Sequence, residues 1–155
     1  MDTLNTELVA IAQDYLNTHI PITRHLGVQV VTFTGHSIEV AAPLAPNINH
    51  QGTGFGGSLA SVAMLAGWTL LHLKIKAENI TCRLVIQKSV MDFTAPVTAD
   101  FKAQCVLPDS EEWGQFREVL TRKGKARIVL QTRVMNGETV AGKHTGTFVA
   151  VMNKQ

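Results

Sequence analysis

The chain has few of the features that mark nucleic-acid-binding or metal-binding proteins. Aromatic residues make up only 6% of its 155 residues, and the formal net charge is only +2. A domain that binds nucleic acid usually needs a strongly basic face and aromatic rings that stack on bases, so we expect no nucleic-acid partner. Its two cysteines, Cys82 and Cys105, fit no metal-ligand spacing. We expect both to be free thiols, and we expect neither a metal nor a cofactor.

The sequence also lacks the segments that direct a protein into or across a membrane. Its opening stretch, MDTLNTELVAIAQ, has no basic region like that of a secretory signal. The most apolar run extends from Leu59 to Leu73 and is shorter than the ~20 residues that span a bilayer. We therefore expect a cytoplasmic protein without a membrane span.

What the chain does have is enough apolar residues for one packed core. Hydrophobic residues account for 45% of the sequence and charged residues for 17%, which excludes a disordered chain. Helical spacing or strand-like composition predicts the following elements: helix 4–19, strands 27–33 and 36–42, helix 56–76, strands 80–95 and 98–107, a short helix or capped turn at 109–120, and strands 124–136 and 139–152.

The helix at 56–76 is apolar nearly all round, so it must be buried on most sides. The strands after it connect through hairpin-length turns, which indicates antiparallel pairing. In strand 124–136 the residues alternate: one face has Ala126, Ile128, Leu130, Thr132 and Val134, and the other has Arg127, Gln131 and Arg133. We predict an α+β fold, one domain over residues 1–155, in which an antiparallel sheet wraps around one long central helix.

The glycine-rich segment before the central helix, NINHQGTGFGGSLA, matches the spacing G-x-G-x-x-G at Gly52, Gly54 and Gly57. A dinucleotide-binding fold needs a strand directly before the first glycine, whereas here the strand ends near Ala42 and two prolines intervene. No Gly-Lys-Ser/Thr follows, which excludes a P-loop. The start of a helix still presents unpaired backbone N–H groups to an oxyanion. The alternative is that the glycines only allow tight packing.

The same segment resembles a known family. The residues that carry the resemblance are Asn49, Gly52, Thr53, Phe55, Gly56 and Gly57. They resemble a motif of the hot-dog fold thioesterase superfamily, and the longer string PNINHQGTGFGGSLA is similar to the YiiD C-terminal domain family, whose members include malonyl-ACP decarboxylases. The resemblance implies a sheet around one helix, an acyl-thioester substrate on acyl carrier protein or CoA, and a homodimer or dimer of dimers.

This chain departs from the thioesterase pattern at two positions. Thioesterases of this branch carry a carboxylate about two turns after the Gly-Gly pair, where this chain has Met64, and no Asp or Glu occurs from Ile48 to Ala77. The histidine of their His-Gly-Gly is Phe55 here. Hydrolysis needs a group that activates water, and this helix supplies none.

Decarboxylation of a malonyl thioester needs no base. It needs a site that excludes water and stabilises the enolate oxygen. We assign this role to the backbone N–H groups of Gly56 and Gly57 and to an asparagine amide, with Asn49 favoured over Asn47. Neutral residues would then line the substrate pocket: Thr53, Phe55, Ser58 and Met64. His50 is a further proton-donor candidate, although a solvent-facing role is the simpler interpretation.

A basic group, which includes Arg122 and Lys123, follows the predicted short helix. It is either a solvated turn or a dock for the phosphate of the phosphopantetheine arm or for an acidic carrier protein. Three hypotheses follow: a malonyl-ACP decarboxylase that starts fatty-acid synthesis, an acyl-CoA or acyl-ACP thioesterase, and an acyl-carrier binding module without catalysis.

Overall fold

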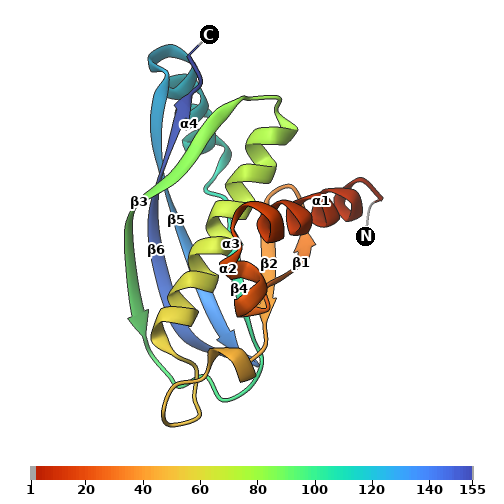
Figure 1. Ribbon diagram of the computed structural model, residues 1–155. Helices are drawn as coiled ribbons and strands as arrows, with labels where there is room; N and C mark the ends of the chain where they lie inside the picture. Colours follow the sequence, from red (N-terminus) through yellow and green to blue (C-terminus); the bar gives the residue numbers. More distant parts are fainter. Residues whose placement is uncertain (1–2, 155) are drawn as a thin grey trace.

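The computed structural model describes residues 3–154, and its elements follow the predicted order (Figure 1). They are α1 (Thr3–His19), α2 (Ile22–Leu26), β1 (Gln29–Phe33), β2 (Ser37–Ala42), η1 (Ala45–Asn47), α3 (Gly56–Ala77), β3 (Cys82–Phe93), β4 (Phe101–Val106), α4 (Ser110–Lys123), β5 (Lys125–Asn136) and β6 (Thr139–Met152).

Three short features differ from the prediction. The helices α2 and η1 were not predicted, because segments of five and three residues are too short to show a helical period. The predicted helix at 109–120 is a full helix that continues to Lys123. Asp109 caps its first turn by accepting a hydrogen bond from the Glu112 N–H, and Gly124 ends it with a positive φ of 74°.

The six strands form one antiparallel sheet in the order β1-β2-β4-β5-β6-β3, which confirms the predicted α+β class. Figure 1 shows the sheet curving around α3, with α1 and α2 on the same side of the sheet near β1. In β5 the residues from Ala126 to Val134 alternate between buried and exposed, so the predicted period of two is confirmed.

The central helix α3 forms the middle of the core. Its side chains at Val62, Ala63, Leu70, Leu71 and Leu73 have no exposed surface. By length and hydropathy α3 is the one described helix that resembles a membrane span, but 67% of that stretch is buried inside the protein. It is therefore the buried core helix of this fold, as the all-round apolar pattern predicts.

The strand β3 lies at one edge of the sheet, beside β6, and leaves apolar side chains in solvent. Val85 is 55% exposed, Val90 44% and Phe93 55%. A long edge strand with exposed apolar residues is a natural template for pairing with another strand. This edge and the start of α3 lie on the same side of the molecule.

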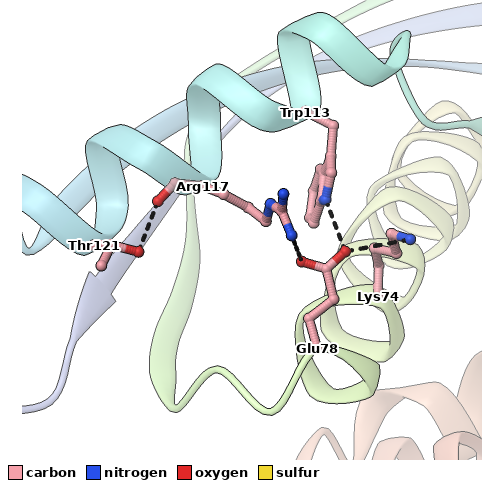
Figure 2. A network of polar contacts seen from close by, with 5 residues as sticks. All are labelled: Lys74, Glu78, Trp113, Arg117 and Thr121. Carbon is pink, nitrogen blue, oxygen red and sulfur yellow. Dashed lines mark hydrogen bonds and ion pairs between the residues drawn. The ribbon is translucent and has the colours of Figure 1, made fainter.

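At the opposite end of α3, Glu78 joins that helix to α4 (Figure 2). Its carboxylate accepts hydrogen bonds from the Trp113 indole (3.0 Å) and from Arg117 (3.1 Å), and Lys74 lies 3.3 Å away. Burial raises the pKa of Glu78, but these three donors together outweigh burial and hold that pKa below its ordinary value. The contact fixes α4 over the end of α3.

We expect Glu78→Gln to lower the free energy of unfolding at pH 7 by about 1 kcal/mol, because it weakens one part-buried hydrogen bond and two ion pairs near the surface. The melting temperature should fall by roughly 2–4 °C. A carboxyl group with a lowered folded-state pKa stabilises the fold only while it is ionised, so the deficit should shrink as the pH falls through that pKa. Thermal melts at pH 7 and pH 3 check this.

Glu118→Gln is the matched control, because Glu118 lies one residue after Arg117 on α4 and is exposed. It should leave the melting temperature unchanged at both values of pH. Equal shifts for the two variants would show that only net charge matters.

Candidate functional site

The loop from Pro43 to Phe55 brings the chain from β2 to the start of α3, at the lower end of the molecule in Figure 1. Asn47 anchors it from inside. Its side chain is 1% exposed, and its amide donates to the carbonyl oxygens of Leu26 (2.8 Å) and Pro43 (2.7 Å). The Asn47 Oδ1 atom is buried without a partner. The two donor hydrogens of Asn47 are thus used to hold backbone segments together.

Asn49 organises the outer part of the loop, and its side chain bonds to other partners than that of Asn47. Its Oδ1 accepts hydrogen bonds from the backbone N–H groups of Gln51 (2.9 Å) and Thr53 (3.1 Å). Its amide donates to Thr53 Oγ1 at 2.8 Å and makes one long contact of 3.5 Å with the Gly54 carbonyl. One amide hydrogen is therefore well bonded, while the other makes only the long contact.

The first turn of α3 opens to solvent. Phe55 is its N-cap residue, and no side chain caps the N–H groups of this turn. A Cβ atom on Gly57 would lie 2.5 Å from the Phe55 ring, so the ring lies directly over this glycine. Gly57 is exposed and Gly56 is half-exposed. Unpaired N–H groups and the helix dipole together favour an anion here.

A hollow of about 410 Å³ lies beside this turn, between α3 and the segment that follows β3. Its lining residues are neutral: Gly54, Gly56, Leu59, Phe93, Thr94, Ala95, Pro96 and Val97. The Gly54 N–H donates to the Val97 carbonyl at 2.8 Å, which ties the glycine loop to this wall. The sequence analysis missed the wall at 93–97. Its signal was Pro96, which directly follows the predicted strand 80–95 and marks the end of that strand.

Of the predicted site residues, Gly56 alone is among the residues that line the hollow, so the roles of the others stay predictions. Asn49, Thr53, Phe55, Gly56 and Gly57 share the loop and the first turn of α3. Ser58 is buried, and Met64 is half-buried about two turns further along the same helix. His50 is exposed on the loop. Asn47 lies beneath this group as part of the loop's support.

Arg122 and Lys123 do not join this group within one chain. They end α4, which Glu78 ties to the far end of α3. A helix of 22 residues is about 33 Å long, so the basic group and the glycine loop lie at opposite ends of the molecule (Figure 1). Within one chain α4 packs against the end of α3 and not its start, so the choice between a solvated turn and a phosphate or carrier-protein dock stays a prediction.

The start of α3 favours an anion, because no side chain caps its first-turn N–H groups. The lining of the hollow contains no carboxylate, and the first turn of α3 contains no acidic residue. Cysteine is not an alternative nucleophile, because burial raises the pKa of Cys105 to about 11 and also raises that of Cys82. Both are free thiols, as predicted.

Comparison with known protein families identifies the chain. Residues 9–152 match the family described as "Putative thioesterase (yiiD_Cterm)". The chain belongs to this family. The match covers the sheet, the central helix and the glycine loop, so the resemblance noted in the sequence extends over nearly all of the protein.

Solved structures agree with this assignment to the thioesterase family. A protein of unknown function from Chlorobaculum tepidum TLS is 34% identical, with 96% of this chain and 97% of that chain covered and a TM-score of 0.91. The "putative thioesterase from Shewanella oneidensis" is 26% identical, with coverages of 94% and 99% and a TM-score of 0.84. A thioesterase from Haemophilus influenzae, at 16% identity, 90% coverage of both chains and a TM-score of 0.70, shares the fold. The fold is the hot-dog fold.

Proposed function

We propose that this acyl-thioester enzyme decarboxylates malonyl-ACP and yields acetyl-ACP for the start of fatty-acid synthesis in the cytoplasm. The observation that supports this most is the pairing of an uncapped helix start at Gly56 and Gly57 with a neutral hollow. Such a site stabilises a developing oxyanion while it lacks a carboxylate that would activate water. The family description of the chain suggests hydrolysis, and that is the second candidate.

The chemistry of malonyl thioesters fits the geometry. When CO₂ leaves, its bonding electrons move into an enolate, and negative charge grows on the thioester oxygen. Backbone N–H groups at the start of α3 and the weakly held amide hydrogen of Asn49 would meet that charge. The apolar wall formed by Phe93 and Val97 would remove water from the substrate carboxylate, which favours loss of CO₂.

A homodimer, or a dimer of dimers, would complete the site. The exposed edge strand β3 is suited to antiparallel pairing with β3 of a second copy. Antiparallel pairing would turn the far end of the partner, which carries Arg122 and Lys123, toward the glycine loop of this chain. These cations would then meet the phosphate of the phosphopantetheine arm or an acidic carrier protein.

We expect the Val85→Lys/Val90→Lys double variant to be a monomer, because two charges on the β3 edge would oppose strand pairing. Light scattering after size exclusion should give a mass of at least twice 16.9 kDa for the wild type and 16.9 kDa for the variant. Val129→Lys is the control, because Val129 is 45% exposed on β5 inside the sheet. A monomeric wild type would remove the dimer from the proposal.

One assay separates the three functions. Purified protein is incubated with malonyl-ACP, and both CO₂ and free thiol are measured. We expect CO₂ and acetyl-ACP without thiol release. Thiol release in step with substrate loss would identify a thioesterase, and binding without either product would identify an acyl-carrier binding module.

A further inference from the structure

A serine hydroxyl and a buried imidazole are in contact outside the glycine loop. Ser89 Oγ lies 2.7 Å from His144 Nε2, although the two residues are 55 positions apart in the sequence. His144 is 1% exposed, whereas Ser89 is exposed on the edge strand β3. Within residues 3–154 no acidic side chain is bonded to His144. The Ser89–His144 pair is therefore a hydroxyl–imidazole pair without a third, acidic member.

The pair faces α3. On β6, His144 and Phe148 are four residues apart in an uninterrupted stretch, so their side chains lie on the same face of the sheet. Phe148 is buried against α3, where a Cβ atom on Gly67 would lie 3.0 Å from its ring. Ser89 contacts His144 and thus lies on this face too.

Two contacts fix the level of the pair along α3. At the lower end, Phe93 lies against Gly56, where a Cβ atom would be 3.1 Å from the ring. Further up, Phe148 lies against Gly67. The β3–β6 register places the Ser89–His144 pair between these two contacts. It therefore lies level with the first three turns of α3, the part that contains Met64.

The proposed reaction needs a proton donor. Loss of CO₂ leaves an enolate, and its α-carbon must gain a proton to give the acetyl group. The neutral lining of the hollow offers one hydroxyl, that of Thr94, which already donates to the Val140 carbonyl at 2.9 Å. His50, the donor considered from the sequence, is exposed on the loop. The Ser89–His144 pair does not line the hollow, but it combines an exposed hydroxyl on the strand that leads to Phe93 with a buried titratable ring.

We propose that Ser89 and His144 deliver the proton that converts the enolate into the acetyl thioester, an inference that rests on the proposed decarboxylation. The Ser89 O–H bond breaks as the C–H bond forms at the α-carbon. The imidazolium N–H of His144 passes its proton to the serine oxygen, which restores the hydroxyl and leaves a neutral imidazole. Solvent then returns the one proton that the reaction consumes.

The surroundings of the pair are consistent with this cycle. Burial lowers the pKa of His144, so the ring is neutral once it has given up its proton. A negatively charged malonyl group entering the same space favours the protonated ring, because an opposite charge nearby raises the pKa of an imidazole. Substrate binding thus favours protonation of His144, and this proton is used in the later protonation of the enolate.

The test measures product formation and CO₂ exchange in the same variants. Wild type, Ser89→Ala, Ser89→Thr and His144→Gln are incubated with malonyl-ACP under ¹³CO₂. Ser89→Ala should form acetyl-ACP about 100-fold more slowly. It should still incorporate ¹³C into the remaining malonyl-ACP, because an enolate that lacks its proton recaptures CO₂. Ser89→Thr keeps the hydroxyl and should recover most of the rate.

The controls separate this role from a structural one. Thr145→Val changes the neighbour of His144 on the other face of β6 and should behave as wild type. If His144→Gln does not fold, the comparison of Ser89→Ala with Ser89→Thr tests the proposal by itself. Both variants should fold, because Ser89 is exposed. Loss of product and exchange together in Ser89→Ala would mean a structural role and would overturn the proposal.

Further outcomes also count against the pair. An unchanged Ser89→Ala rate would overturn it, and so would a His50→Gln variant that shows the exchange phenotype instead. Thiol release that depends on Ser89 would identify a nucleophile in place of a proton donor. A wild type that releases no CO₂ would overturn the proposed decarboxylation itself. An active wild type together with an equally active Ser89→Ala variant would overturn only the role of the pair.

Discussion

Replacing Asn49 by alanine is expected to lower the turnover of malonyl-ACP by ~100- to 1000-fold, which is the usual effect of losing one oxyanion donor. The melting temperature should fall by only a few degrees, because the half-exposed Asn49 side chain makes its hydrogen bonds within a surface loop. Steady-state kinetics with malonyl-ACP and a thermal melt of the same preparation check both parts.

Asn49→Asp distinguishes donation from loop support. Aspartate keeps the oxygen that accepts from Gln51 and Thr53 and loses only the amide donor. If the amide donates to the oxyanion, Asn49→Asp should be as inactive as Asn49→Ala. An active Asn49→Asp would show that Asn49 acts by ordering the loop, and full activity in both variants would exclude Asn49 from the reaction.

Asn47→Ala is expected to lower the free energy of unfolding by about 2–3 kcal/mol, because it leaves the carbonyls of Leu26 and Pro43 unpaired inside the protein. The loss of the unpartnered Oδ1 atom offsets part of this cost. The melting temperature should drop by roughly 5–10 °C. Chemical denaturation and a thermal melt provide the measurement.

The aspartate substitution should have opposite structural consequences at the two asparagines. At position 47 it would place a second oxygen against two carbonyl oxygens, so Asn47→Asp should be less stable than Asn47→Ala. At position 49 the oxygen is the atom that the loop uses, so Asn49→Asp should fold as wild type. An Asn47→Asp variant with wild-type stability would show that the Asn47 amide does not hold Leu26 and Pro43.

Local pattern was enough to predict the main elements. The all-round apolar character of 56–76 and the alternation in 124–136 are signals that neighbouring residues create together, and both elements are present. The short helix α2 carries no such signal. The true length of α4 depends on Gly124, which ends the helix through a positive φ. Boundaries of this kind rest on single residues whose conformation the periodicity does not encode.

Sequence alone could propose the part of the candidate site that is continuous in sequence, but not the part that folding assembles. The string from Asn49 to Gly57 could be recognised because its residues are neighbours. The distinct roles of Asn47 and Asn49 could not, because the Asn47 amide bonds to Leu26, 21 residues away. The wall at 93–97 and the Ser89–His144 pair depend on the β3–β6 register, which no local pattern reveals.

The position of β3 has a consequence for how the enzyme would respond to its own abundance. The strand that carries Ser89 is also the strand whose apolar edge we expect a second copy to cover. Self-association and chemistry would then share one surface, and the rate per molecule would depend on the total concentration of the protein by mass action. At low concentration the dimer would dissociate, so total activity would fall more steeply than the protein concentration. The cell could then set the activity through the amount of protein it makes, without a separate inhibitor.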